Sequence, residues 1–556
     1  MKIGAKEEAL HRSIHKPENE TALSVTYHTS HRSFLFPYSL YVQSWVKMGA
    51  QDQKKKRVLV VGAGAAGMSC ADGLSNHPDR FDVTLIEAQN YCGGQAFSIP
   101  IDKEKYGASW MNQGVQGGSY IYHHTFRFFD KYADVPAQHV DLQVAFGKDD
   151  TFWTNLYPTE LLAKHSKEIK RFKWVIRFMR WFEVFFAVIP IKISLKMFFF
   201  SDDFLNFMIY PALALFLGTG NATPNLPTIM MERLYTSPTY GMWYQVDEKS
   251  LSSNLPPMVV FPEETKFYTK WQHELEARGV KVRLSTEVDA VVERGSKGVK
   301  VLTRPRRPQP DNHNPNDADH DLPQTLEEYD EIVLCVLADT AERLLGKTSR
   351  WIDRQVLGST KWADDITVTH TDTEYMEKWY TCHFDDKHAV SKIAGRDDSD
   401  RVERGKTDFN PMYLIKNVPA DPKLLEMCFD CSNFQYQLKE KKLPFEQHVF
   451  QTIFLNKKNS DTWSRDEIKK DKIIREDWWH QLMHEWTHYV KVVPWMWLLN
   501  GKKRTTYAAA WTLVNAHELA VISGMAAAYR LGAAYPKELE EDPFALLCFR
   551  RKLAQS

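Results

Sequence analysis

The chain has 556 residues, with 71 Lys plus Arg and 71 Asp plus Glu, so its formal net charge is zero. This balance argues against the basic surface that nucleic-acid binding requires, and 43% hydrophobic residues exclude a disordered chain. Seven Cys are too few for a disulfide scaffold and indicate a reducing, intracellular compartment.

Residues 1–53 are expected to form a flexible N-terminal extension. The extension is charged from its start and lacks an apolar run of the length that a secretory signal needs. Met48 lies just ahead of the first strong strand and is an alternative start of translation. We therefore expect a protein without a signal peptide, located in the cytoplasm or peripherally on a membrane.

A dinucleotide-binding fingerprint follows the extension. VLVVGAGAAGMSCADGL at 58–74 predicts a strand, a glycine-rich turn and a helix, and VTLIEA at 83–88 predicts the second strand of a βαβ unit. Gly62 allows the tight turn, Gly64 lets the backbone approach a pyrophosphate, and Gly67 lets the helix pack on the strand. Glu87, twenty residues after Gly67, is placed to bind ribose hydroxyls. The intervening turn residues complete the predicted cofactor contact: Ala63, Ala65 and Ala66.

The segment after this acid resembles the superfamily of flavin amine oxidases, protoporphyrinogen oxidases and phytoene desaturases. EAQNYCGGQAFS at 87–98 is similar to the EAxxxxGGR of that superfamily. The resemblance implies bound FAD, with Ala88, Gly93 and Gly94 in a second glycine-rich loop over its pyrophosphate. Gln95 stands where Arg is usual, so we expect amide hydrogen bonding to replace one charged phosphate contact.

Two distant segments extend the resemblance. RGVKVRLSTEVDAV at 278–291 resembles the strand pair in which the backbone of Val288 would bracket adenine. RTTYAAAWTLVNAHELAVISGMAAAYRLG at 504–532 resembles the strand and helix that close the flavin site. The resemblance implies a helix that starts near Asn515 and directs its N-terminus at the isoalloxazine N1–C2 edge. The cofactor residues implied in this segment are Trp511, Asn515, His517 and Glu518.

The resemblance also implies the architecture. We expect an α/β fold with a discontinuous, Rossmann-like FAD-binding domain of the glutathione reductase type and an interleaved α+β substrate domain. The FAD-binding domain is expected to comprise residues 54–120, 258–345 and 500–535. The substrate domain is expected to comprise residues 121–257 and 346–499, and a C-terminal tail would follow at 536–556.

Two apolar stretches fail as membrane spans. Residues 181–200 are interrupted by charged residues and Pro190, and residues 204–218 are short and contain Pro211. We expect core helices or an apolar surface that dips into one leaflet, which would give a peripheral membrane contact. Fourteen of the 46 residues at 171–216 are aromatic, so the aromatic excess belongs mainly to the substrate side, with plain core packing as the alternative.

Several histidines and cysteines are further candidates. His484, Glu485 and His488 match HExxH, which on a helix could hold zinc, but no third ligand follows at a recognised spacing. Core histidines or the border of a substrate cavity are the alternative interpretations, and no metal site is expected. CxxC at 428–431 is interpreted as a pair of structural cysteines. The candidates to line the substrate site are His123, His124, His370 and His488.

The resemblance implies an FAD-dependent oxidoreductase that passes hydride from a lipophilic small molecule to flavin N5. A fatty acyl, polyene or isoprenoid chain, or an amine, would be the substrate, and FAD would be bound noncovalently. Three alternatives remain: an FAD-dependent double-bond isomerase of polyunsaturated fatty acids, a non-catalytic flavin-binding protein, and a zinc peptidase. No catalytic base is assigned, and the oligomeric state and the electron acceptor stay open.

Overall fold

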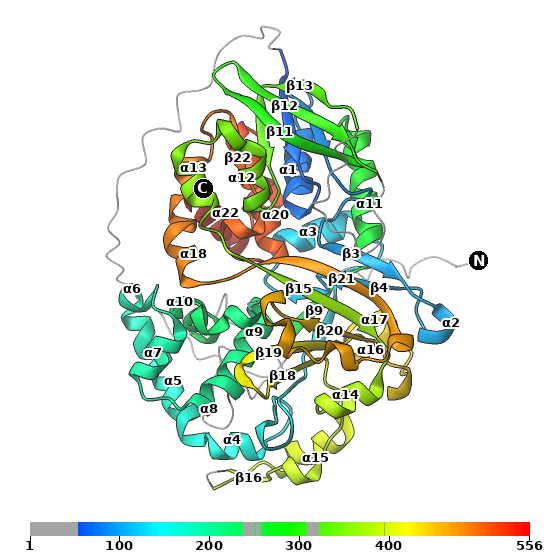
Figure 1. Ribbon diagram of the computed structural model, residues 1–556, viewed down its shortest axis with the longest axis vertical. Coiled ribbons are helices and arrows are strands. Elements are labelled where there is room, and N and C mark those ends of the chain that lie inside the picture. The colour runs from blue at the N-terminus through cyan, green and yellow to red at the C-terminus, as the bar shows by residue number, and fades with distance from the viewer. Residues whose placement is uncertain are drawn as a thin grey trace, which may run out of the picture. The chain divides into compact units, whose positions relative to one another are not determined.

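A five-stranded parallel sheet carries the glycine motif in the computed structural model of the protein, which describes residues 54–218, 220–236, 251, 257–307, 322–393 and 395–555 (Figure 1). The predicted extension at 1–53 lies outside these residues. The strand order is β10-β2-β1-β14-β22, and all neighbours are parallel. Three distant segments of the chain build this sheet, so the predicted discontinuous Rossmann-like fold is confirmed. The strands are β1 (Lys56–Val61), β2 (Phe81–Ile86), β10 (Lys281–Arg283), β14 (Glu331–Leu334) and β22 (Thr505–Tyr507).

Side chains alternate along β1 between two buried faces of this sheet. Val58 and Val60 pack with helices α1, α11 and α20, whereas Leu59 and Val61 pack with α12, α13 and the antiparallel sheet β11-β12-β13. Burial on both faces explains the continuous apolar runs of these strands. The elements are α1 (Ala65–Ser75), α11 (Glu264–Ala277), α20 (His517–Leu531), α12 (Ala338–Leu345), α13 (Trp351–Leu357), β11 (Thr286–Gly295), β12 (Gly298–Pro305) and β13 (Thr325–Tyr329).

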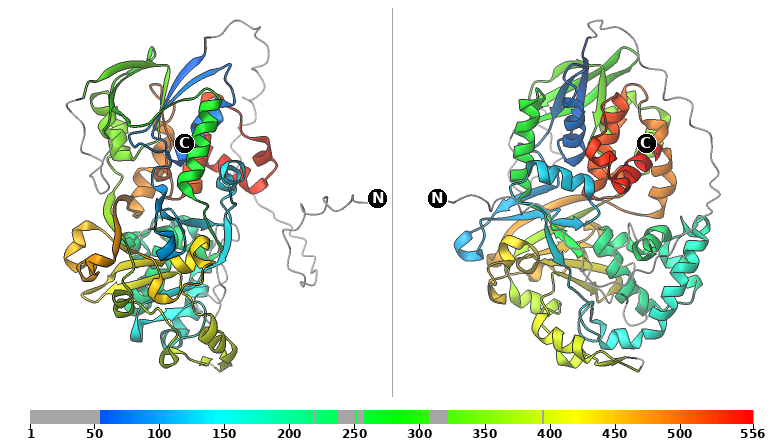
Figure 2. Two further views of the ribbon diagram at one scale, coloured as in Figure 1. Left: turned by 90° about the vertical axis from the view of Figure 1, so that its right-hand side faces the viewer. Right: turned by 180° about the vertical axis from the view of Figure 1, so that it is seen from behind.

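A seven-stranded mixed sheet forms the centre of the second half (Figures 1 and 2). Its order is β21-β15-β20-β19-β18-β7-β8, and only the β18–β7 pair is parallel. The strands are β7 (Val144–Phe146), β8 (Trp153–Thr154), β15 (Trp362–His370), β18 (Tyr413–Val418), β19 (Asp421–Asp430), β20 (Phe450–Phe454) and β21 (Ile473–Leu482). The helices packed against it include α4 (Glu160–Lys164), α5 (Ser166–Trp181), α6 (Glu183–Phe186), α7 (Ile191–Met197), α8 (Asp202–Phe204), α9 (Tyr210–Leu217) and α10 (Thr228–Thr236).

Short elements connect the two halves. They are β3 (Ala96–Pro100), α2 (Lys103–Tyr106), β4 (Trp110–Gly114), β5 (Gly117–Ser119), α3 (His123–Tyr132), β6 (Gln138–Asp141) and β9 (Pro257–Val260). The peripheral elements are α14 (Thr373–Trp379), β16 (Lys392–Ile393), β17 (Arg396–Asp397), α15 (Ser399–Asp408), α16 (Cys431–Phe434), α17 (Tyr436–Lys439), α18 (Trp486–Lys491) and α19 (Met496–Leu499). The segment predicted as a C-terminal tail forms α21 (Lys537–Glu540) and α22 (Pro543–Gln555), and Ala545 and Phe549 are buried with α20.

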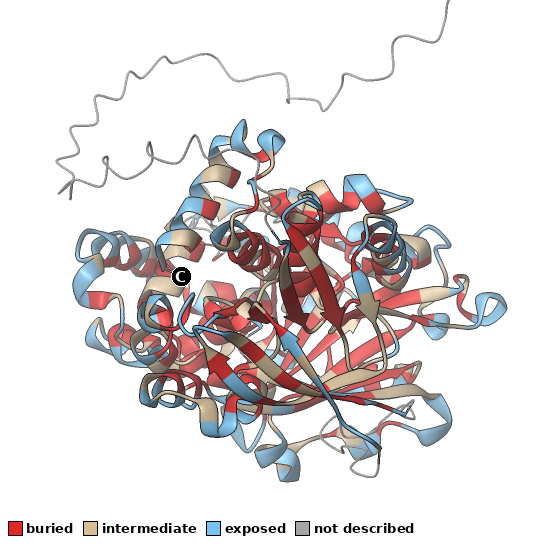
Figure 3. Ribbon diagram, turned by 90° about the horizontal axis from the view of Figure 1, so that it is seen from above, coloured by how far each residue is buried: buried red, intermediate tan, exposed pale blue. Residues whose placement is uncertain are grey.

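The aromatic block at 171–216 divides into core and surface. Phe172, Phe200 and Phe204 are buried, while 83% of Trp181 and 86% of Phe199 are exposed. Viewed from above, buried residues follow the sheets and the inner faces of the helices (Figure 3). No helix within the described residues is long and apolar enough to cross a membrane. Core packing therefore explains only part of the aromatic excess.

Candidate functional site

Glycines shape the turn between β1 and α1. Gly62 has φ of +97°, a backbone conformation that favours glycine. A Cβ on Gly67 would lie 1.8 Å from the carbonyl oxygen of Gly62, so no side chain fits there. Gly64 is the N-cap of α1, and no side chain among the described residues caps the helix. The first-turn amides are thus left for an anion, as at other phosphate-binding helix N-termini.

The second glycine-rich loop lies against the first. The Gly93 amide donates to the carbonyl of Ala63 at 2.9 Å, and Gly64 and Gly93 form a parallel bridge. Gly93 and Gly94 have φ of +127° and +63°, and half-buried Gln95 follows them. The structure therefore brings the two predicted phosphate loops together.

Glu87 closes this turn from the end of β2. Its Oε2 accepts from the Ala63 amide at 2.7 Å, and its Oε1 accepts from the Gln89 amide at 2.9 Å. Burial raises the pKa of Glu87, and the backbone donors oppose that effect. A carboxylate has about four lone-pair positions, so the backbone donors leave part of this acceptor capacity for ribose hydroxyls. Ala88 follows and is half-buried.

The start of β11 is bound to the same loop. The Thr286 amide donates to the carbonyl of Glu87 at 2.9 Å, and the Ser285 amide donates to the carbonyl of Gln89 at 2.8 Å. Val288 follows two residues later and is buried, with an irregularity of the strand register just after it. Val288, the predicted adenine contact, is therefore two residues from the backbone that is hydrogen-bonded to the Glu87 loop.

Helix α20 packs on α1 through glycine. A Cβ on Gly524 would lie 2.0 Å from the carbonyl oxygen of Ala66, and Ser69 Oγ donates to the carbonyl of Val521 at 2.9 Å. Further along both helices, a Cβ on Gly73 would lie 2.9 Å from the Cβ of Ala528. The two helices therefore run in the same direction, and their N-termini point the same way.

The approach to α20 is joined to its surroundings by hydrogen bonds. Trp511 is buried, and its Nε1 donates to the carbonyl of Val336 at 2.9 Å. The Asn515 amide donates to Nε2 of His484 at 3.1 Å, and the Asn515 side chain donates to Gln481 Oε1 at 3.0 Å. The helix itself begins at His517, two residues later than the sequence predicts.

His517 and Glu518 face α3 in this structure. Glu518 accepts from the backbone amides of His124 at 3.0 Å and Thr125 at 2.8 Å, and its Oε1 lies 2.6 Å from His124 Nδ1. Burial would raise the pKa of Glu518, but His124 and the two amides hold it below its ordinary value. Nε2 of His517 lies 2.7 Å from the Tyr268 hydroxyl. The Glu518 carboxylate thus satisfies the N-terminus of α3, and direct FAD contacts by these two side chains stay predictions.

The histidines predicted to line the substrate site do not converge. His123 pairs with Asp542 near the C-terminus, and His124 is buried beneath α20. His370 on β15 is fully buried and contacts Thr452 at 2.9 Å, and burial lowers its pKa to about 3. Each of these three residues has a partner within the fold, and their role in lining a substrate site stays a prediction.

The two histidines of the HExxH match at 484–488 do not lie on one helix. His484 precedes α18, Glu485 is the N-cap, and only His488 lies within the helix. Glu485 pairs with Lys361 at 3.1 Å, and His484 Nδ1 contacts Tyr489 at 2.9 Å. Burial lowers the pKa of His488 to about 4, as expected of a core histidine. The i, i+4 arrangement required by the zinc alternative is absent from this described segment.

The sequence interpretation missed a buried cluster of amide side chains between β4 and the seven-stranded sheet. Gln113 Nε2 donates to Thr369 Oγ1 at 3.0 Å and to Asp477 Oδ2 at 2.6 Å. The members are at most 4% exposed. We name this set the amide cluster: Asn112, Gln113, Gln116, Gln435 and Gln451.

The strand pair β3–β4 connects the amide cluster to the second phosphate loop. β3 begins directly after Gln95, and Ala96 pairs with Gly114 on β4. A Cβ on Gly114 would lie 2.8 Å from the indole of Trp479, whose ring packs 5.8 Å from that of Phe97. An aromatic wall thus adjoins the polar cluster.

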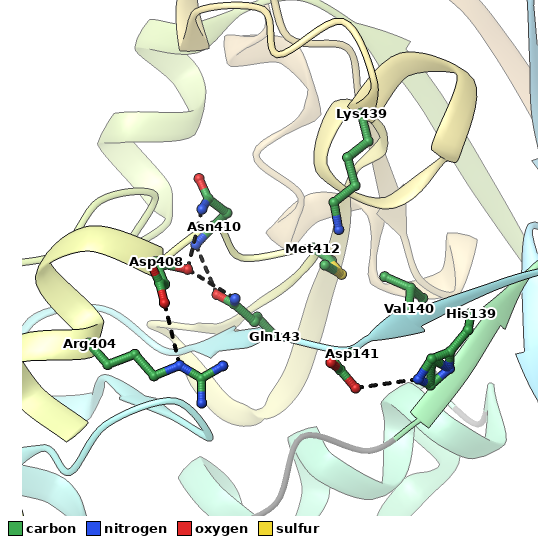
Figure 4. Close-up of a pocket in the computed structure, with 9 residues that line it drawn as sticks. All are labelled: His139, Val140, Asp141, Gln143, Arg404, Asp408, Asn410, Met412 and Lys439. Atoms are coloured by element: carbon green, nitrogen blue, oxygen red, sulfur yellow. Dashed lines mark hydrogen bonds and ion pairs between the residues drawn. The ribbon is translucent and has the colours of Figure 1, made fainter. Parts of the chain in front are cut away.

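Two surface cavities lie elsewhere. The larger has a volume of about 410 Å³, and charged residues on its wall pair with one another: His139 with Asp141 at 3.6 Å and Arg404 with Asp408 at 3.5 Å (Figure 4). The smaller, of about 250 Å³, lies at the exposed end of β2 and β10 and includes Asp82. Neither cavity includes a predicted cofactor residue or a member of the amide cluster.

Known proteins share this architecture. Residues 60–132 match the NAD(P)-binding Rossmann-like domain family. No curated protein matches the sequence. A putrescine oxidase bound to putrescine has a similar structure, with a TM-score of 0.53 and 13% identity over 86% of this chain and 100% of the other. The protein has the fold of the flavin amine oxidase-like superfamily.

Two further solved structures share the flavin amine oxidase-like fold. A CLA-producing fatty acid isomerase from P. acnes has a TM-score of 0.52 and 12% identity, over 86% of this chain and 98% of the other. A protein from Exiguobacterium sp. 255-15 assigned as a protoporphyrinogen oxidase has the same TM-score and identity, over 86% and 99%. The resemblance predicted from the sequence is thus confirmed for the fold.

The residues of this flavin amine oxidase-like fold fit a dinucleotide. Gly62 and Gly67 give the turn its close backbone approach, and Gly64 faces the second loop without a side chain. The uncapped first turn of α1 would hold the pyrophosphate, and Glu87 would hold a ribose. All of these groups meet at the carboxyl ends of β1 and β2, where ligands bind in doubly wound sheets.

Proposed function

We propose that the protein is an FAD-dependent oxidoreductase that removes hydride from a lipophilic small molecule. The observation that carries the proposal is the joining of two glycine loops by the Gly93-to-Ala63 hydrogen bond. A nicotinamide site needs only the first loop, whereas the second loop and the parallel α20 favour FAD. When bound, FAD would supply the hydride acceptor.

The roles of the chain are binding, orientation and electrostatics. The α1 N-terminus and the Gly93–Gly94 loop would bind the pyrophosphate, while the positive end of the α20 dipole would stabilise negative charge on a reduced cofactor. Gln113 and its neighbours would position a substrate indirectly, by fixing β4 against the seven-stranded sheet, because both Nε2 protons of Gln113 are donated within the protein. The burial of this cluster supports a water-poor reaction site.

The surroundings of the amide cluster support a lipophilic substrate. Phe97 and Trp479 lie on one side of it, and a Cβ on Gly117 would lie 2.9 Å from the ring of Phe434. An apolar site gains about 0.8 kcal/mol for each methylene that it buries. A fatty acyl, polyene or isoprenoid chain would gain more from this environment than a short diamine.

A second candidate is double-bond isomerisation of a polyunsaturated fatty acid with no net oxidation. The structural likeness to the fatty acid isomerase favours it, since its TM-score of 0.52 is close to the 0.53 of the putrescine oxidase. The two candidates share the cofactor site and the apolar substrate. They differ in whether hydride returns to the substrate.

Anaerobic mixing tests both candidates. Purified protein loaded with FAD would be mixed with linoleic acid, with a polyene and with putrescine, and flavin absorbance and product mass would be followed. Lasting bleaching by a lipophilic compound supports the oxidoreductase, and a product of unchanged mass supports the isomerase. Bleaching by putrescine alone would contradict the lipophilic assignment, and unreactive FAD with every compound would favour a non-catalytic flavin protein.

A further inference from the structure

Exposed apolar side chains cover helices α5, α6 and α7. Val184 is 95%, Phe199 86% and Trp181 83% exposed. Single exposed apolar residues are common on soluble proteins, but large contiguous patches mark interaction sites. We call this set the aromatic face: Trp174, Phe178, Trp181, Phe182, Val184, Phe185, Val188, Ile193, Met197 and Phe199.

The aromatic face is contiguous. Trp174, Phe178 and Trp181 stand at i, i+4 and i+7 on α5, so they form one stripe, while the core side of α5 uses other residues. The ring of Phe178 lies 4.6 Å from that of Phe182 and 5.7 Å from that of Phe198. These contacts join α5 to α6 and to the end of α7, and Figure 1 shows the three helices next to one another.

Phe199 is held outward by its backbone. Its φ is +60°, a conformation rare for an aromatic residue. Arg171 Nη2 donates to the Phe199 carbonyl at 3.0 Å, and the same guanidinium lies 4.6 Å from the Phe200 ring centre. Phe200 is buried, so the turn fixes one ring in the core and presents the next to solvent.

Positive charge surrounds the aromatic face. Residues 166–200 contain eight basic and two acidic residues, although the whole chain is neutral. Both acids are engaged, because Glu168 contacts His165 at 2.7 Å and Glu183 contacts Arg233 at 2.6 Å. Two of the basic residues are also paired: Arg171 with Glu168 at 3.5 Å, and Lys196 with Asp202, just beyond this stretch, at 2.8 Å. The basic residues are Lys167, Lys170, Arg171, Lys173, Arg177, Arg180, Lys192 and Lys196.

We propose that the aromatic face docks the protein on an anionic lipid leaflet, with its apolar side chains inserted at headgroup depth and its basic residues beside lipid phosphates. Amphipathic helices with aromatic and basic residues bind membranes in this way. A second copy of the chain fits less well, because a two-fold interface would place the same positive charges opposite one another. The docking proposal is independent of the proposed oxidoreductase activity.

Vesicle flotation with the full chain tests the proposal. The protein is expected to float with phosphatidylcholine vesicles that contain about 30% phosphatidylserine, to bind pure phosphatidylcholine far less, and to be released by ~0.5 M NaCl. Trp181→Ser with Phe185→Ser should weaken binding at least about tenfold. The double variant Lys173→Glu with Arg177→Glu should weaken binding to the anionic vesicles by more than about fivefold for each replaced residue.

Trp351→Ser is the matched control, because Trp351 is 68% exposed but lies on α13. It should float like the unmodified protein, and unchanged melting temperatures would show that all variants fold. Absence of flotation with anionic vesicles, or equal loss in the control, would overturn the proposal. A dimer in sedimentation velocity that the aromatic variants dissociate, with no vesicle binding, would assign the face to a second copy instead.

Discussion

Replacing Gly524 with alanine tests whether the contact between α1 and α20 maintains the cofactor site. The added Cβ would lie 2.0 Å from the Ala66 carbonyl oxygen, whereas ordinary contacts begin at 3.4 Å, so the helices must separate by about 1.4 Å. Overpacking costs about 1–3 kcal/mol. Separation also weakens the 2.9 Å bond from Ser69 to Val521, worth about 1 kcal/mol. We expect the free energy of unfolding to fall by about 2–4 kcal/mol.

Thermal unfolding and FAD content after gel filtration measure the effect. An unfolding entropy of about 2.1 cal/mol/K per residue makes 1 kcal/mol equivalent to about 1 °C for ~500 residues, so Tm should fall by about 2–4 °C. FAD content should fall as well, because the shift displaces the N-terminus of α20. Gly295→Ala is the control, since nothing lies within 4 Å of its Cβ. Full FAD content and unchanged Tm in Gly524→Ala would refute the reasoning.

Three further changes test buried polar groups. Burial lowers the pKa of Lys552 to about 7, although its Nζ donates to Thr512 Oγ1 at 2.6 Å. The unfolded chain therefore takes up this proton first, and stability is lost as pH falls from the unfolded pKa of about 10.4 to about 7. Lys552→Met should therefore stabilise the protein by roughly 2 kcal/mol near pH 6 and by much less near pH 10, as measured by denaturant unfolding. The same difference in free energy of unfolding between variant and unmodified protein at both pH values would contradict this. Burial raises the pKa of Glu264, whose carboxylate has no hydrogen-bond partner among the described residues, so its contribution is lost as pH rises above the unfolded pKa. Glu264→Gln should flatten that loss in the same unfolding assay, and an unaltered pH slope would count against it. Gln113→Leu should lower kcat/KM for a lipophilic substrate about 10–100-fold with FAD retained, whereas full turnover or loss of FAD would exclude a substrate-positioning role.

The cofactor half follows from local sequence because its constraints are local. A glycine at 62 and another at 67 fulfil steric requirements within one turn, and the following acid ends the next strand. The amide cluster gives no such signal. Asn112 and Gln451 are 339 positions apart, and only the packing of β4 on the seven-stranded sheet brings the Gln451 amide to the Asn112 carbonyl at 3.2 Å.

The face of a strand or helix that each side chain occupies could not be predicted from the sequence either. Thr369 faces the amide cluster, whereas His370, the next residue, contacts Thr452 and Phe450 on the other side of β15. Side chains of a strand alternate with period two, so a one-residue ambiguity reverses the interpretation. In α5 the helical period separates buried Phe172 from exposed Trp174, which composition alone cannot distinguish.

The visible absorption spectrum of the purified protein, before and after denaturation, tests the central claim most directly. The account predicts a flavin spectrum that stays with the folded chain and is released on denaturation, at about one FAD per chain because the described residues form one pair of phosphate loops. A side chain at position 67 would clash with the carbonyl oxygen of Gly62, so Gly67→Val should abolish this spectrum. A colourless preparation that also fails to take up added FAD would contradict the account.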